Sequence, residues 1–145
     1  MKHGIVCLCL VFMLCGCQWT RSSFEQGTVD MQTYIMNLQQ DLYEEESLFP
    51  LVNEHSLPFS TIIERYQLDT VDIKQAYVYE SISELQGAKI AFFLMDEKSH
   101  AYVKKQWVKS LSRKQRNQCK DGRIGRYSYF VVGVDAQKVV NYIKG

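Results

Sequence analysis

The apolar run from Ala88 to Met95 constrains the fold more than any other stretch, because only Lys89 interrupts it. Alternate residues of a strand point to opposite faces of a sheet, and here both sets are apolar. The run therefore predicts a strand that is buried on both sides, or central in its sheet. Residues 76–82 contain the β-favouring sequence Tyr-Val-Tyr and predict a partner strand, with residues 83–87 closing a hairpin between the two.

Two helices are predicted before these strands. Asp30 is a suitable N-cap, and the apolar residues behind it recur with helical spacing: Met31, Tyr34, Ile35, Leu38 and Leu42. Ser56 followed by Pro58 predicts the start of a second, short helix. Its apolar residues are Phe59, Ile62, Ile63 and Tyr66.

The C-terminal half predicts further elements of both kinds. They are a long helix from His100 to about Gln118 that Ser99 caps, a loop over 120–126, a strand over 127–134, and a final helix capped by Asp135. The whole pattern predicts an α+β fold. We expect a three-stranded, mainly antiparallel sheet packed with about four helices.

The first seventeen residues have the layout of an export signal, with Lys2 before an apolar run of 11 residues from Gly4 to Leu14. As a helix this run would span about 16 Å, half of a hydrocarbon core of about 30 Å. The end of the run resembles the lipobox of bacterial lipoprotein signal peptides: Leu14, Cys15, Gly16 and Cys17, with Cys15 where Ala, Ser or Thr is usual. We expect residues 1–16 to be a cleaved signal peptide and Cys17 to carry lipid. The alternative is an ordinary secretory signal whose cysteines are incidental.

The remaining chain predicts one domain. Residues 17–27 are polar and lack periodicity, which indicates a short tether, and residues 28–145 suffice for a single α+β domain. Of the five cysteines, three lie in the predicted signal and Cys17 would be lipidated, which leaves Cys119 alone. We therefore expect no intrachain disulfide, no zinc cluster and no cofactor. The predicted location is the extracytoplasmic face of the cell membrane.

The charges of the predicted mature chain are segregated along the sequence. Residues 17–97 hold 4 Lys/Arg and 14 Asp/Glu, whereas residues 98–145 hold 12 Lys/Arg and 2 Asp/Glu. One interpretation is that the two halves attract each other across the fold.

Basic residues also gather on one side of the predicted long helix. Lys105, Lys109, Arg113, Arg116 and Lys120 fall within an arc of roughly 80° on a continuous helix. Such a ridge is either simply solvated or binds an anionic partner. The candidate partners are anionic lipid headgroups beneath the anchor, a cell-wall polymer or an acidic protein. Nucleic acid is disfavoured for an exported domain without an aromatic-studded groove.

No catalytic signature accompanies these features. The two histidines outside the predicted signal, His55 and His100, lie in different segments, and no nucleophile-elbow, zinc-protease or phosphate-loop motif is present. We therefore expect a non-catalytic binding or accessory protein and not an enzyme. Two alternatives remain. One is a solute-binding module with a pocket between sheet and long helix near Trp107 and Tyr129, and the other is an enzyme that uses Asp69, His100 or Cys119.

The order of these elements resembles a family of short Firmicute lipoproteins grouped as a domain of unknown function. The resemblance covers about residues 28–143 and rests on these segments: Thr28–Met31, Tyr66–Asp69, Val78–Ser81, Lys89–Phe93, the Arg/Gln-rich helix and Tyr129–Gly133. A Glu often precedes the Ile of the second strand in that family, where this chain has Lys89. The resemblance implies a lipid-anchored α+β domain on the outer face of a Gram-positive membrane, with no established activity.

Overall fold

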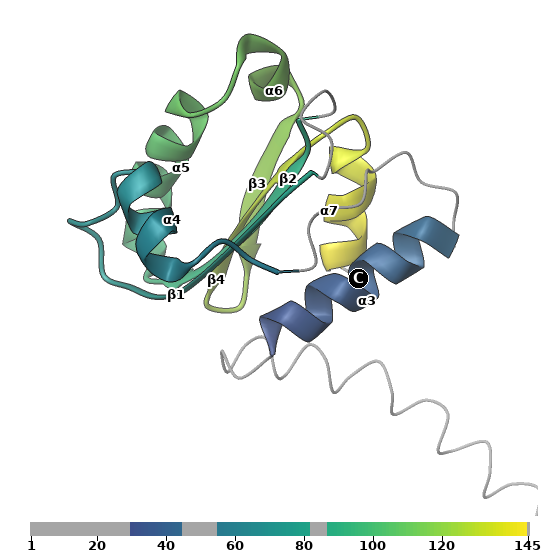
Figure 1. The fold of residues 1–145 in the computed structure, drawn as a ribbon, viewed down its shortest axis with the longest axis horizontal. Coiled ribbons are helices and arrows are strands. Elements are labelled where there is room, and N and C mark those ends of the chain that lie inside the picture. Colours follow the sequence, from purple (N-terminus) through teal and green to yellow (C-terminus); the bar gives the residue numbers. More distant parts are fainter. Residues whose placement is uncertain (1–29, 45–54, 82–86, 145) are drawn as a thin grey trace, which may run out of the picture.

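The structure is a computed structural model that describes residues 30–44, 55–81 and 87–144, although not the side chains of 42–44. These residues form a four-stranded antiparallel sheet with helices on both faces (Figure 1). The strands are β1 (Ile73–Glu80), β2 (Lys89–Met95), β3 (Cys119–Ile124) and β4 (Tyr127–Val132), in the spatial order β1-β2-β4-β3. The helices are α3 (Met31–Glu44), α4 (Phe59–Arg65), α5 (His100–Lys109), α6 (Arg113–Asn117) and α7 (Ala136–Lys144), with a 3₁₀ turn, η1 (Glu97–Ser99), before α5.

The prediction for the apolar run is confirmed. β2 pairs antiparallel with β1 on one side and with β4 on the other, and it is buried from Ile90 to Met95. Its partner β1 comes from the predicted hairpin, with Tyr79 opposite Ile90 and Ala76 opposite Phe93. The predicted connection over 83–87 lies mostly outside the described residues.

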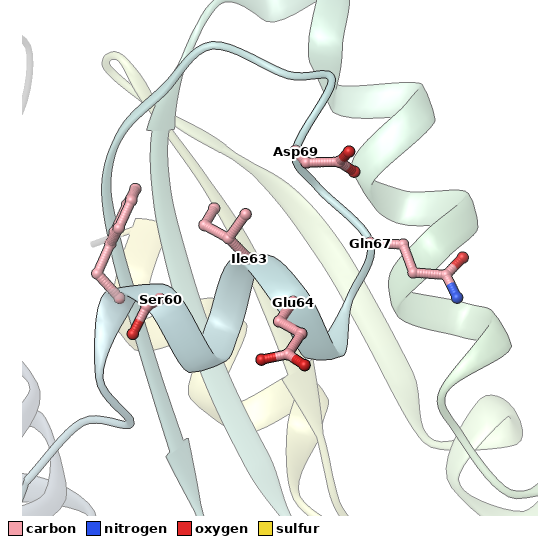
Figure 2. A pocket seen from close by; sticks show the side chains of 6 residues that line it. Ser60, Ile63, Glu64, Gln67 and Asp69 are labelled. Atoms are coloured by element: carbon pink, nitrogen blue, oxygen red, sulfur yellow. The ribbon is translucent and has the colours of Figure 1, made fainter.

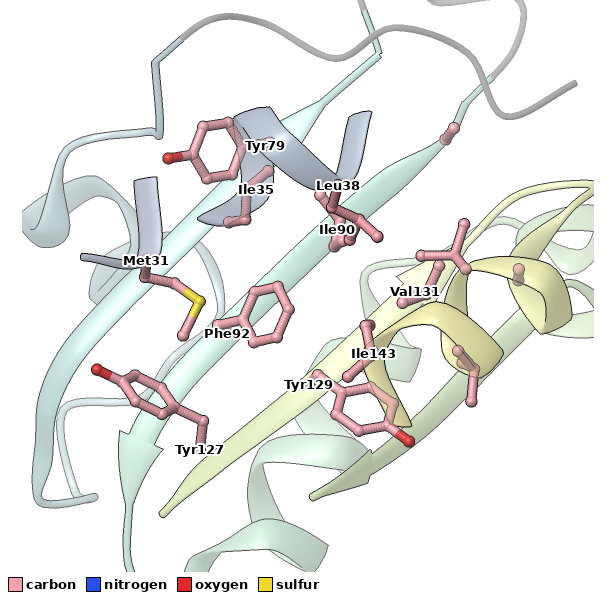
Figure 3. Packing of buried hydrophobic residues seen from close by; sticks show 14 of the residues in the cluster. Met31, Ile35, Leu38, Tyr79, Ile90, Phe92, Tyr127, Tyr129, Val131 and Ile143 are labelled. Carbon is pink, nitrogen blue, oxygen red and sulfur yellow. The ribbon is translucent and has the colours of Figure 1, made fainter. Parts of the chain in front are cut away.

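Each face of the sheet carries its own core. On one face, α3 packs its predicted apolar stripe, including Met31 and Ile35, against the sheet, and α7 adds Val139 and Ile143. Figure 3 shows Met31, Ile35 and Ile143 in this cluster. On the other face, α4 and α5 pack Ile62, Val103 and Trp107 against the sheet. The fold therefore has three layers, with the sheet in the middle.

The predicted number of strands is wrong, because residues 119–124 form a strand and not a loop. β3 and β4 make a hairpin whose turn is Gly125 and Arg126, and Gly125 has a φ of 55°, in the left-handed region that glycine adopts without strain. The sequence of β3, Cys-Lys-Asp-Gly-Arg-Ile, is polar and lies at the sheet edge. Such an edge strand lacks the hydrophobic pattern by which strands are recognised.

The predicted long helix is also wrong, because it breaks into α5 and α6. Ser112 and Gln115 form a reciprocal capping box that starts a new helix: Gln115 N donates to Ser112 Oγ at 3.2 Å, and Ser112 N donates to Gln115 Oε1 at 2.8 Å. The described residues thus form five α-helices and not four.

The predicted caps have mixed outcomes. Asp30 caps α3, since its Oδ1 accepts from Gln32 N at 3.2 Å and from Thr33 N at 3.4 Å. The short helix α4 exists, but its N-cap is Pro58 without a side-chain bond. Ser56 caps the sheet edge instead, because its Oγ accepts from Val78 N at 2.9 Å.

Candidate functional site

The basic residues predicted on one helix stripe come from three elements. All five are exposed: Lys105 and Lys109 on α5, Arg113 and Arg116 on α6, and Lys120 on β3. The single stripe is therefore a wrong prediction. Lys120 alternates with Asp121 along β3 and so points to the sheet face opposite α5. We call Lys105, Lys109, Arg113 and Arg116 the basic face. Arg116 ties α6 back to the end of α5, because its Nε donates to the carbonyls of Val108 at 3.2 Å and Leu111 at 3.1 Å.

The basic face has no carboxylate partner within the described residues. The salt bridges between described side chains join other residues: Arg65 and Lys89 to Glu80, Lys74 to Asp72, and His100 and Lys104 to Asp121. Within the described part of the chain, no ion pair therefore joins the basic face to the acidic half.

A second cluster of polar side chains lies where the start of α5 meets the β3–β4 hairpin. His100 Nε2 donates to Asp121 Oδ2 at 2.9 Å, and Nδ1 of the same ring lies 2.8 Å from Ser128 Oγ. Lys104 Nζ lies 2.8 Å from the other carboxylate oxygen of Asp121, and Arg123 donates to Ser128 Oγ at 3.2 Å. We call these five residues the polar clamp.

The geometry of the strands explains why these residues meet. Asp121 and Arg123 alternate along β3 and so point to the same face of the sheet, and Arg123 pairs directly with Ser128 of β4. His100 and Lys104 are four residues apart on α5 and present one side of that helix. Sequence reasoning missed Asp121 because a loop was expected over 120–126. Ser128 fell in the predicted strand over 127–134, but nothing in the sequence singled it out there.

The electrostatics of the polar clamp favour a charged carboxylate. Burial raises the pKa of Asp121, but hydrogen bonds from Lys104 and His100 outweigh it and leave this pKa below its usual value. The hydrogen bond and the charge of Asp121 in turn raise the pKa of Lys104. The clamp therefore holds a carboxylate between two donors.

The polar clamp has the residue types of a hydrolase triad but not its accessibility. In such a triad the serine hydroxyl must meet a substrate carbonyl. Ser128 is 0% exposed, and the His100 ring stacks on Phe130 with ring centroids 5.4 Å apart. A substrate cannot reach this hydroxyl, so the arrangement positions α5 on the sheet and does not expose a nucleophile.

The residues named for a cryptic enzyme do not converge. Asp69 lies on the turn after α4, His100 belongs to the polar clamp, and Cys119 opens β3. Among the described residues no hydrogen bond joins any two of them. Burial raises the pKa of the Cys119 thiol, which disfavours the reactive thiolate.

The residues named for a solute pocket lie on opposite sides of the sheet. Trp107 packs between α5 and the sheet, where it stacks with Tyr66 at 4.9 Å and contacts Phe130 at 5.6 Å between centroids. Tyr129 belongs to the core under α7. The two aromatic residues therefore cannot line one pocket.

Comparison with protein-family models, with curated proteins and with solved structures finds no match. The resemblance to short Firmicute lipoproteins therefore stays a prediction.

Within 30–44, 55–81 and 87–144, no group of three His, Cys, Asp or Glu side chains could hold a metal ion. In that same part of the chain, no helix has the length and apolar character needed to cross a membrane. The predicted lipobox (Leu14, Cys15, Gly16 and Cys17) and the predicted tether lie outside the described residues.

Proposed function

We propose that this protein is a lipid-anchored, non-catalytic binding domain at the extracytoplasmic face of the membrane, where its basic face contacts anionic lipid headgroups. The observation that supports the proposal is the gathering of exposed cations on α5 and α6: none of the four cations of the basic face forms a salt bridge with a described carboxylate. Cations near an anionic membrane surface contribute about 1 kcal/mol each.

The expected anchor places the domain within reach of such a surface. Residues 17–27 form an 11-residue tether, which spans at most about 40 Å when fully extended. Lipid at Cys17 gives membrane attachment, and the basic face then sets the orientation of the domain on the headgroups. Lipid and cationic face together are the two signals that stable anchoring needs.

The anchor is tested by Cys17→Ser. We expect this variant to remain without lipid and to keep its signal peptide, because no thiol is present for lipid transfer. Cys119→Ser is the matched control and should fractionate like the unmodified chain. Membrane association and processing of Cys17→Ser that match the unmodified chain would contradict the proposal.

The basic face is tested by the double variant Lys105→Gln/Lys109→Gln. Loss of two surface cations, about 2 kcal/mol, should weaken binding to phosphatidylglycerol vesicles roughly 30-fold, measured by co-sedimentation with the Cys17→Ser background. Arg116 is left intact because it caps α5.

The matched control is Lys98→Gln/Lys144→Gln, which removes the same charge from exposed sites outside the basic face. We expect it to lose much less affinity, and we expect 1 M salt to abolish binding of every form, since screening shortens the range of these interactions to about 3 Å. Equal losses in both double variants would show that net charge alone attracts the domain, and the specific role of the basic face would then be wrong.

A further inference from the structure

A hollow with an apolar wall and an acidic rim lies at α4, which covers the same face of the sheet as α5. It has a volume of about 540 Å³ and is formed by α4 and the turn that follows it (Figure 2). The residues that line it are Phe59, Ser60, Ile63, Glu64, Gln67 and Asp69. The basic face contributes none of them.

The wall of this hollow is apolar and open to solvent. Phe59 is 46% exposed, although it begins a helix whose Ile62 is fully buried. The same ring also borders a second hollow of about 320 Å³ along β1, beside Ser56 and Leu57. Phe59 thus stands between two depressions and offers apolar surface to both, as an anchoring site for a partner side chain does.

The rim of the hollow is negative. Glu64 and Asp69 are exposed, and among the described residues neither carboxylate forms a salt bridge or a hydrogen bond. The neighbouring cations are already paired, because Arg65 lies 2.8 Å from Glu80 and Lys74 lies 2.9 Å from Asp72. Among the described residues that line the hollow there is no Lys or Arg.

The turn that carries Gln67 and Asp69 is held in place by the fold. Leu68 is fully buried and its N–H donates to Ile63 O at 2.9 Å. From α5, the Tyr102 hydroxyl donates to Gln67 O at 3.4 Å. The hollow is therefore preformed, and a ligand would not have to order this turn.

We propose that this hollow binds a short basic peptide segment of a partner protein, with an apolar side chain against Phe59 and Ile63 and with flanking Lys or Arg side chains on Glu64 and Asp69. Charge complementarity identifies the occupant, since two unpaired carboxylates beside an apolar wall favour a cationic, apolar ligand. The volume suits one or two side chains and not a folded domain. The proposal does not depend on the lipid anchor or on the basic face.

The test uses the full chain in non-ionic detergent and a fluorescent hexapeptide with two lysines on each side of a Leu-Phe pair. We expect saturable binding by fluorescence anisotropy, and a roughly tenfold weaker affinity for Glu64→Gln/Asp69→Asn. Phe59→Ala should weaken binding to a similar degree without unfolding the domain, because nearly half of this residue is exposed. Unchanged circular dichroism of each variant checks the fold.

Matched controls separate the site from net charge. Asp96→Asn/Glu97→Gln removes two exposed carboxylates outside the hollow and should bind the peptide with nearly unchanged affinity. A peptide with glutamates in place of its lysines, and one with glycines in place of Leu-Phe, should bind at least tenfold more weakly.

Three results would overturn the proposal. The first is no binding of the lysine peptide at 1 mM, and the second is an equal loss of affinity in the two double variants. The third is self-association of the chain that Glu64→Gln/Asp69→Asn abolishes while the peptide does not compete, since the occupant would then be a second copy of this chain.

Discussion

Gly122 is the residue whose identity the fold constrains most visibly. It lies opposite Tyr129 in the β3–β4 hairpin, and a Cβ built on it would lie 2.3 Å from the Tyr129 hydroxyl oxygen and 2.6 Å from the adjacent ring carbon. The Tyr129 ring is buried across the strand at this point. Only a residue without a side chain leaves room for it, which is a recurrent pairing of glycine with an aromatic residue in sheets.

We predict that Gly122→Ala destabilises the domain by about 2 kcal/mol, the usual cost of forcing one extra carbon into a packed site. Thermal unfolding followed by circular dichroism measures the effect. Lys120→Ala, at an exposed position of the same strand, should change stability by less than about 0.5 kcal/mol.

A double-mutant cycle identifies the cause. Tyr129→Ala costs stability in the unmodified chain, but in the Gly122→Ala background it also relieves the clash, so the two effects should not add. Strict additivity would mean that Gly122 matters for another reason, such as the backbone freedom of β3.

At the scale of elements, the polar clamp fixes α5 on the β3–β4 hairpin. Because Asp121 receives hydrogen bonds from Lys104 and His100, its pKa in the folded protein lies below the unfolded value. The stability that its carboxylate contributes is therefore fully present above the unfolded pKa of about 3.9. It is lost as the pH falls from there through the lower folded pKa.

We predict that Asp121→Asn lowers the free energy of unfolding by about 1–2 kcal/mol at pH 7, since hydrogen bonds to a charged group are lost from a partly buried site. The difference between variant and unmodified chain should shrink below about pH 3.9. Urea unfolding at pH 7, 5 and 3 measures it.

Lys104→Gln is a second probe of the same network. It should reduce the part of the free energy of unfolding that is lost as the pH falls through the same window. A difference between Asp121→Asn and the unmodified chain that is constant from pH 7 to pH 3 would mean that the charge of Asp121 does not stabilise the clamp.

Elements with a clear hydrophobic period were predictable from sequence, and those defined by polar contacts were not. The helix stripe Met31, Ile35 and Leu38 and the double-sided strand β2 were recognised because buried surface leaves a pattern. The break at Ser112 depends on a local capping box, which competes with a continuous helix by a small margin. β3 is polar and forms a strand through its pairing with β4, so its sequence carries little strand signal.

At the scale of the whole molecule, the same limit applies to the candidate sites. The basic residues were identified from the sequence, but their arrangement was not. A continuous helix was predicted, whereas a turn separates α5 from α6. The hollow at α4, with its apolar wall and acidic rim, was not predicted from the sequence. It combines α4 with a turn whose position follows from the burial of Leu68 and the contact with Tyr102, and such tertiary contacts leave no periodic trace.

The two candidate surfaces also differ in sign, and this follows from the charge segregation along the chain. Acidic residues dominate before residue 98 and basic residues after it. The fold places α4 with the first group, whereas α5 and α6 belong to the second. A domain with opposite charges on separate surfaces is suited to hold two different partners at once.

The bond from Ser56 to the outer side of β1 has a consequence for solubility. β1 is an edge strand, and an open edge invites another chain to add to the sheet. Ser56 Oγ accepts from Val78 N at 2.9 Å, and Leu57 N donates to Val78 O at 2.9 Å, so this rung is already occupied. Ser56 and Leu57 thus cover this part of the β1 edge and hinder the addition of a strand from another chain.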